Sequence, residues 1–228
     1  MSTVTTVPSV VEPEPDRWFV LPDVSWEGYL AINNAVVNPR GLRMIYCDGR
    51  LTLVTTSRKH DWYAERLAEL VKVLAEQLGI LWEDGGGATY RREEMNSGVE
   101  GDKTFYFGEH AELMKGPQDI DLAVQPPPDL AIEVEVSHPA DHAMVVWGRL
   151  GVPEVWRFDP IADQFGFWLR QNDGTYVRSE SGRAFPMLTA DDILGQMQLA
   201  DQLGAGRWNA RLAVWVRDVI VPRQGEGG

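Results

Sequence analysis

Residues 119–137 read DIDLAVQPPPDLAIEVEVS, and this stretch decides the fold. Its pattern predicts two buried strands, at 120–124 and 130–136, joined by three consecutive prolines. Side chains alternate between the two faces of a strand, so the second strand carries apolar groups on one face and carboxylates on the other. The apolar set is Leu130, Ile132, Val134 and Val136, and the acidic set is Asp129, Glu133 and Glu135.

Three carboxylates on one face of an apolar strand cannot all be buried and charged without a cation, hydrogen-bond donors or water. A divalent metal site is one interpretation, because Mg²⁺ binds one or two carboxylates together with waters and substrate phosphate. A general acid–base pair without metal is a second. The third is structural: the carboxylates pair with arginines on neighbouring strands or face solvent. Spacing alone favours this third interpretation.

The composition predicts an ordinary globular protein, with 44% hydrophobic and 24% charged residues in a chain of 228. No apolar run approaches the roughly 20 residues that a membrane helix needs. The first residues lack the basic and apolar segments of a signal peptide. A single cysteine, Cys47, excludes an intramolecular disulfide and fits a reducing compartment. We therefore expect a cytoplasmic protein with no membrane partner.

The formal net charge of -13 counts against a nucleic-acid partner, because phosphate contacts from basic side chains supply most non-specific affinity. A local basic patch would form only if the arginines gathered on one face. The arginines in question are Arg91, Arg92, Arg149, Arg157, Arg170, Arg178 and Arg183.

The order of the expected elements implies an α/β domain whose mixed central sheet is flanked by helices. We expect a disordered tail at residues 1–17, one domain at 18–221 and a second disordered tail at 222–228. The clearest local signals are a hairpin of 42–47 with 50–55 around Asp48-Gly49, and a helix at 58–79 that ends at Gly79. His60 lies in the first turn of that helix. We interpret it as a buried or capping histidine in preference to a catalytic one.

The remaining expected elements follow the same rules of periodicity and turn chemistry. Further strands are expected at 80–83, 88–92, 105–107, 155–158, 165–170 and 176–179, with a polar connection at 93–101. Further helices are expected at 26–35, in about ten residues ending at 151, at 190–198 and at about 207–219. No serine or cysteine nucleophile has a histidine at supporting spacing. His138 and His142 are four residues apart, but no cysteine cluster or HExxH motif supports zinc.

Three segments together resemble the Uma-type restriction-endonuclease-like family, which belongs to the PD-(D/E)XK nuclease superfamily. They are GDK at 101–103, the stretch at 119–137, and LGVPEVWRFDP at 150–160. The resemblance extends over about residues 22–220. It implies a restriction-endonuclease-like core, with a mixed central β-sheet, flanking helices and extra hairpins.

The resemblance also implies a site and an activity. Asp102 matches the first motif aspartate, a metal ligand in the superfamily, and Glu133 matches the acid of the central strand. The carbonyl of Val134 would complete the protein ligands to Mg²⁺ or Mn²⁺. The implied function is an endodeoxyribonuclease that hydrolyses DNA phosphodiester bonds. His60 matches a position that the family often fills with histidine.

Two departures from the family pattern concern the lysine that activates water and stabilises the transition state. The superfamily lysine would stand at position 135, where this chain has Glu135, and the alternative position in the following helix holds Ala143. Glu135 could coordinate a second metal, and Lys103 or Arg149 could reach the site. A third departure is Gly101, which stands where the motif usually has proline.

Three hypotheses therefore stay open. The first is a Mg²⁺-dependent nuclease that uses Asp102, Glu133 and Glu135. The second is a catalytically inactive relative that binds nucleic acid or a protein on the same fold. The third is an acidic protein whose carboxylates are structural. The tryptophan-containing last helix is expected to pack on its own domain, and a homodimer through it is the alternative.

Overall fold

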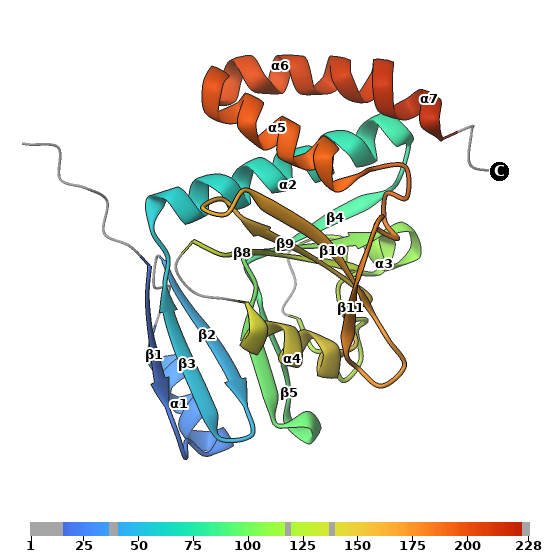
Figure 1. Ribbon diagram of the computed structural model, residues 1–228. Coiled ribbons are helices and arrows are strands. Elements are labelled where there is room, and N and C mark those ends of the chain that lie inside the picture. Colours follow the sequence, from blue (N-terminus) through green and yellow to red (C-terminus); the bar gives the residue numbers. More distant parts are fainter. Residues whose placement is uncertain (1–15, 37–40, 117–119, 137–139, 225–228) are drawn as a thin grey trace, which may run out of the picture.

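The computed structural model describes residues 16–36, 41–116, 120–136, 140–224 of the chain. It contains a six-stranded mixed sheet, a five-stranded antiparallel sheet and helices packed on both (Figure 1). The six-stranded sheet runs in the order β11-β10-β9-β8-β7-β4, and only its central pair, β8 and β9, is parallel. Its strands are β4 (Trp82–Gly86), β7 (Lys103–Phe107), β8 (Leu130–Val134), β9 (Glu154–Asp159), β10 (Gln164–Arg170) and β11 (Tyr176–Ser179).

The five-stranded sheet runs in the order β1-β3-β2-β6-β5, with all neighbours antiparallel. Its strands are β1 (Arg17–Leu21), β2 (Leu42–Cys47), β3 (Arg50–Thr55), β5 (Thr89–Arg92) and β6 (Ser97–Glu100). The helices are α1 (Trp26–Ala35), α2 (Arg58–Leu78), α3 (Gly108–Leu113), α4 (Asp141–Leu150), α5 (Ala190–Leu203), α6 (Ala205–Trp215) and α7 (Val221–Arg223), with a 3-10 turn, η1 (Glu93–Met95), and a π-helical turn, η2 (Val216–Ile220). None of these helices, within the described ranges, is long and apolar enough to cross a membrane.

The central strand β8 is buried on both faces because helices cover both. Leu130, Ile132 and Val134 pack in a core with α2, α5 and α6. Ala131, on the other face, packs in a second core that α4 forms between the two sheets. Glu133 shares the α4 face, since it lies two residues beyond Ala131. The predicted mixed central sheet flanked by helices is therefore confirmed, and it carries a second sheet that was not predicted.

Local sequence rules explain the elements that the sequence predicted best. Asp48 and Gly49 both have positive φ, 48° and 86°, as a type I′ turn requires, and Cys47 pairs with Arg50 across it. Helix α2 ends where Gly79 adopts the left-handed conformation at φ 67°. Thr189 caps α5 in a reciprocal capping box with Asp192.

The strand predicted at 120–124 was wrong. Residues 122–124 form a turn. The Asp121 carbonyl accepts backbone N–H groups from Val124 at 3.1 Å and Gln125 at 2.8 Å, and its carboxylate accepts the N–H of Ala123. An aspartate that bonds its own backbone in this way offers the chain an alternative to a sheet ladder. Strand β8 also ends at Val134 rather than 136, although Glu135 N–H still donates to the Phe158 carbonyl.

Strands β1 and β6 were missed. The residues of β6 were predicted as part of a polar connection, because Ser97 and Gly98 carry no apolar signal. Gly98 is required there, since a Cβ added to it would collide with the hydroxyl of Tyr29. β1 starts at Arg17, inside the segment expected to be disordered; residues 1–15 and 225–228 lie outside the described ranges.

Candidate functional site

Asp102 immediately precedes β7 and lies across from Glu133 of β8. The antiparallel register pairs Lys103 with Ile132. The same register, extended by one residue, places Asp102 opposite Glu133. The Val134 N–H donates to Asp102 Oδ2 at 2.8 Å, so the backbone of β8 fixes this carboxylate. Asp102 is only 5% exposed. The two residues that the family resemblance selected are thus adjacent in the sheet.

Glu133 is buried on the α4 face, at 8% exposure, and its Oε1 accepts the indole N–H of Trp147 at 2.6 Å. Burial raises the pKa of the Glu133 carboxyl well above its usual range, and the nearby charge of Asp102 raises it further. The hydrogen bond from Trp147 acts in the opposite direction but does not cancel these effects. Burial and a neighbouring negative charge thus shift the pKa of Glu133 upward, in the direction opposite to the shift at Asp102.

His60 supplies the charge that keeps Asp102 ionised. It is 2% exposed in the first turn of α2, and its Nε2 lies 3.1 Å from Asp102 Oδ2. Burial alone would lower the pKa of His60, but the charge and hydrogen bond of Asp102 raise it to about 10. Burial would likewise raise the pKa of Asp102, and the charge of His60 reverses this and lowers it. Arg43 adds a second positive charge, with Nε 3.9 Å from Asp102 Oδ1.

Glu135 belongs to a different set of contacts. Its Oε1 accepts hydrogen bonds from Arg157 Nε at 2.9 Å, from Arg157 Nη2, and from the Ala140 N–H at 2.6 Å. Arg157 Nη2 also lies 3.1 Å from Asp141 Oδ1. The structural interpretation, a carboxylate paired with an arginine of the neighbouring strand, thus describes Glu135 as the structure places it.

Asp129 lies apart from both. Its carboxylate accepts the Phe107 N–H at 2.8 Å and contacts His110 Nδ1 at 2.9 Å. The three carboxylates that the alternation placed on one face thus have three separate sets of partners. Only Glu133 meets Asp102.

The basic residues proposed as substitutes for the motif lysine are engaged elsewhere. Lys103 pairs with Glu65, and Arg149 pairs with Asp48. Ala143, at the alternative lysine position, is buried in the core around α4. Within the described part of the chain, no lysine contacts Asp102 or Glu133.

The donor atoms fit a hard divalent cation of the Mg²⁺ or Mn²⁺ type. The described residues contain no group of three or more His, Cys, Asp or Glu side chains arranged to hold a metal. Mg²⁺ does not require such a group, since it is commonly held by one or two carboxylates with waters and phosphate oxygens. No hydrogen bond from the described residues reaches Glu133 Oε2. That oxygen, Asp102 Oδ1 and the carbonyl of Val134 are ligands of the type such an ion prefers.

Sequence reasoning did not connect three residues with this pair. Arg43 comes from a distant strand, and Trp147 served only as the aromatic residue that marks the alternative lysine position at Ala143. Arg157 was noted only as one of several arginines. The position of His60 in the first turn of a strongly patterned helix was the one available signal for it. His138 lies outside the described residues, and His142 contacts Thr52 at 2.9 Å, away from this site.

The model of the Uma2 family, described as "Putative restriction endonuclease", matches residues 26–202. This range is well over half of the chain and contains both Asp102 and Glu133. No curated protein matches the chain.

Proposed function

Because this chain belongs to the Uma2 family of restriction-endonuclease-like proteins, we propose that it is a divalent-metal-dependent endonuclease that hydrolyses phosphodiester bonds in DNA. The observation that supports the proposal best is that Asp102, immediately before β7, lies across from Glu133 of the neighbouring strand β8, in a buried setting. Asp102, Glu133 and the carbonyl of Val134 would hold Mg²⁺ or Mn²⁺. When bound, such an ion polarises a phosphoryl oxygen and lowers the pKa of a coordinated water.

The residues themselves prepare this site in two ways. The Val134 amide and His60 orient Asp102 and keep it ionised, so it is ready to accept a cation. Trp147 fixes Glu133 through Oε1, and no hydrogen bond from the described residues occupies Oε2. In the overall reaction the oxygen of water bonds to phosphorus as the bond to one sugar oxygen breaks. One proton from the water ends on the leaving oxygen, which gives an alcohol and a phosphate monoester.

A second candidate function is supported by the charges around Asp102. His60 and Arg43 already balance that carboxylate, and neither lysine position of the family pattern carries a cation. These features favour an inactive relative that binds nucleic acid or a protein without cutting. The net charge of -13 makes nucleic-acid retention in such a relative dependent on low salt.

Nicking of supercoiled plasmid with Mg²⁺ or Mn²⁺ tests the proposal. Asp102→Asn and Glu133→Gln each preserve shape and remove one carboxylate, and each should lower the nicking rate by about two orders of magnitude or more. Asp129→Asn is the matched control, because among the described residues the Asp129 carboxylate hydrogen-bonds with Phe107 and His110 and not with Asp102 or Glu133. Its rate should stay within about twofold of wild type.

Nicking that needs no metal, or that continues unchanged in both site variants, would exclude the proposed nuclease. DNA retention at low salt with no nicking by wild type would support the inactive relative. Failure to retain DNA at low salt would favour the third hypothesis, in which the carboxylates are structural.

A further inference from the structure

Arg157 of β9 lies directly beside Glu133 of β8. The two strands are parallel, and their register pairs Glu133 with Arg157. Paired residues on neighbouring strands project from the same face of a sheet. Arg157 therefore shares the face that carries Glu133 and, two residues further along, Glu135.

The guanidinium group of Arg157 reaches the place where a lysine at position 135 would project. Glu135 occupies that position, and its carboxylate accepts hydrogen bonds from Arg157 Nε and Nη2. Glu135 is not itself a cation, but it holds the guanidinium of Arg157 at the position where the family pattern has a lysine. Nη1 of Arg157 makes no hydrogen bond with the described residues, so part of the guanidinium fork stays available.

Three further features fix the orientation of Arg157. Asp141, at the start of α4, lies 3.1 Å from Nη2. The guanidinium also stacks over the ring of Trp168, 5.1 Å from its centroid. Trp168 in turn needs Gly166 beside it, because a Cβ at Gly166 would lie 2.9 Å from the indole nitrogen. Gly166 is the antiparallel partner of Arg157, so the sequence leaves room for this stack.

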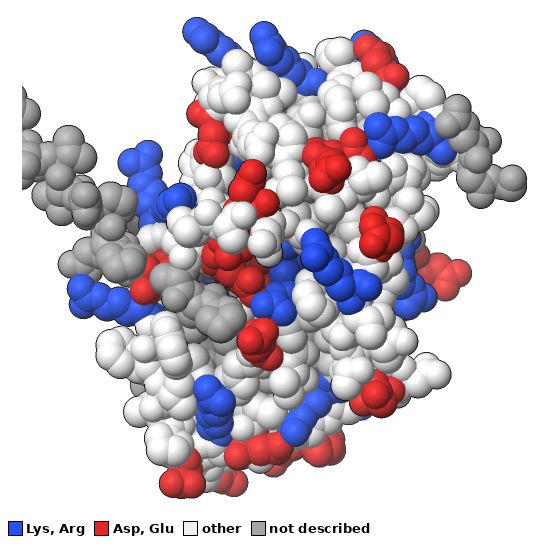
Figure 2. Space-filling view, in the orientation of Figure 1, with Lys and Arg blue, Asp and Glu red and all other residues white. Residues whose placement is uncertain are grey.

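Arg157 and Trp168 also line two adjoining grooves, of about 420 and 290 Å³. Arg170 borders the larger groove and Arg178 the smaller one. Both arginines donate to main-chain carbonyls, of Gly148 and Phe165, so no carboxylate cancels their charge through these bonds. Figure 2 shows basic side chains gathered over β9 and β10, with acidic ones around them. Acidic residues line the same grooves, Asp141 and Asp173 in the larger and Glu135 and Asp159 in the smaller, so the positive charge that an anionic strand would meet next to Arg157 is confined to Arg170 and Arg178.

We propose that Arg157 contacts the scissile phosphate and takes the role of the missing motif lysine, with Glu135 and Trp168 as positioning residues. The inference rests on the proposed nuclease function. Hydrolysis increases the negative charge on the non-bridging phosphate oxygens, and a preorganised guanidinium stabilises that charge through planar, paired hydrogen bonds.

The experiment compares Arg157→Ala and Arg157→Lys with wild type in metal-dependent plasmid nicking. Arg157→Ala should lower kcat about 100-fold or more and change KM by less than about threefold, with Arg157→Lys in between. Millimolar guanidinium should raise the nicking rate of Arg157→Ala at least tenfold above its rate without guanidinium. It should not raise the rate of Asp102→Asn. Arg217→Ala is the matched control, because Arg217 is exposed on η2 and pairs with Asp218.

Two measurements separate this role from a purely structural one. The double variant Glu135→Lys with Arg157→Ala returns a lysine to position 135 and should recover nicking relative to Arg157→Ala. Without any metal, Arg157→Ala should bind a fluorescent DNA duplex within about threefold of wild type at low salt, because the proposed contact acts mainly on the transition state. Thermal unfolding monitors whether each variant is folded.

The outcomes are distinct. Wild type without metal-dependent nicking overturns the proposed function and this inference together. Nicking that requires Asp102 but proceeds at the wild-type rate in Arg157→Ala overturns this inference alone. Loss of nicking in Arg157→Ala that neither guanidinium nor the double variant recovers shows a structural role, and also overturns it.

Discussion

Two groups fix the carboxylate of Asp102, the side chain of His60 and the main-chain amide of Val134. The Val134 N–H and His60 share its Oδ2, at 2.8 and 3.1 Å. Both His60 and Asp102 are almost fully buried, so their attraction is poorly screened by solvent. The pair therefore contributes to stability as well as to the site.

The pH dependence of stability should reveal the His60–Asp102 pair. His60 has its pKa raised from 6.5 to about 10 in the folded protein. A raised histidine pKa contributes stability that is fully present below the unfolded value and disappears as the pH rises through the folded value. Urea unfolding of wild type and His60→Gln at several pH values between 6 and 11 measures this. The gap between them should be a few kcal/mol near pH 6 and close gradually up to about pH 10.

Tyrosines and lysines also titrate in that range, but they do so in both proteins, so the gap isolates His60. His142→Gln is the matched control: burial lowers the pKa of His142 to about 4, so that histidine is neutral throughout the range. A gap between wild type and His60→Gln that does not change with pH would contradict the assigned charge of His60.

The site could be predicted from sequence only where the family pattern names a residue. Asp102 and Glu133 came from that pattern, and the sheet register places them side by side. Alternation alone grouped Glu133 with Asp129 and Glu135, because it reports the face of a strand and not the partner on that face. Arg157 reaches Glu135 through the pairing of two strands that are separated by α4 in the chain. No local signal encodes such a pairing.

At the scale of elements, prediction succeeded where local chemistry was sufficient and failed where tertiary contacts decided. The Asp48-Gly49 hairpin and the long helix to Gly79 follow from turn chemistry and periodicity. β6 could not be predicted, because its Ser97-Gly98 sequence is stabilised by pairing with two other strands and by the Tyr29 ring. The last predicted helix is interrupted by the π-helical turn η2, which periodicity does not signal.

Two helical glycines should respond in opposite ways to alanine. Gly148 in α4 lies against the hairpin of β10 and β11, and an added Cβ would overlap the carbonyl oxygen of Gly174. Gly148→Ala should lower the free energy of unfolding by about 1 to 3 kcal/mol or more, because backbone has to move. Gly195 in α5 is exposed and has no atom near its added Cβ. Gly195→Ala should raise the free energy of unfolding by about 0.5 to 1 kcal/mol.

Urea unfolding of the two variants beside wild type measures both effects. Helix propensity is the same for both substitutions, so the difference between them reports the contact with Gly174. Equal changes in stability for both glycines would show that α4 does not pack tightly on that hairpin.

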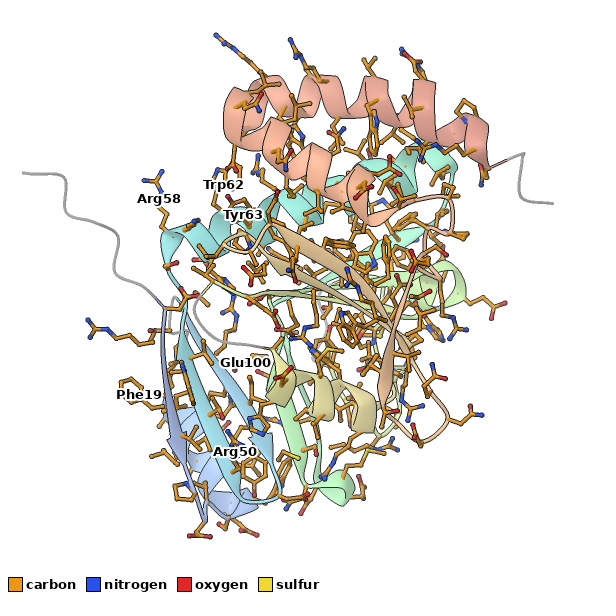
Figure 3. The ribbon with its side chains drawn as sticks, viewed as in Figure 1. Phe19, Arg50, Arg58, Trp62, Tyr63 and Glu100 are labelled. Carbon is orange, nitrogen blue, oxygen red and sulfur yellow. The ribbon has the colours of Figure 1, made fainter. Side chains whose placement is uncertain are left out.

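At the scale of the whole molecule, the hydrophobic side chains form three cores of unequal size. The largest joins α2, α5 and α6 to the six-stranded sheet, and the second surrounds α4 between the sheets. The third lies under α1, and its buried members among the described residues are Tyr29, Met44, Tyr46 and Leu51. The edge strand β1 borders it, with Trp18 49% and Phe19 59% exposed, and Phe19 points outward from the ribbon (Figure 3). A homodimer through the last helix, the alternative that the sequence left open, stays a prediction.

The corner of α1 and β1 should therefore open separately from the rest of the molecule. Local opening free energies range from near zero in weakly packed regions up to the global value in the core. Native-state hydrogen exchange should give lower opening free energies for amides of β1 than for those of β8, which is buried on both faces. The site lies on β7 and β8, so this opening would leave Asp102 and Glu133 protected.

Two leucine truncations test whether these regions are coupled. Leu51→Ala removes a fully buried side chain of the small core, and should lower protection in β1 and β3 before it affects β8. Leu130→Ala, in the largest core, should lower protection in all strands together, because it acts through global unfolding. If Leu51→Ala instead lowers protection of β8 as much as that of β1, the two sheets unfold as one cooperative unit. In that case the small core contributes to the rigidity of the site through β2 and β6, which connect it to α4.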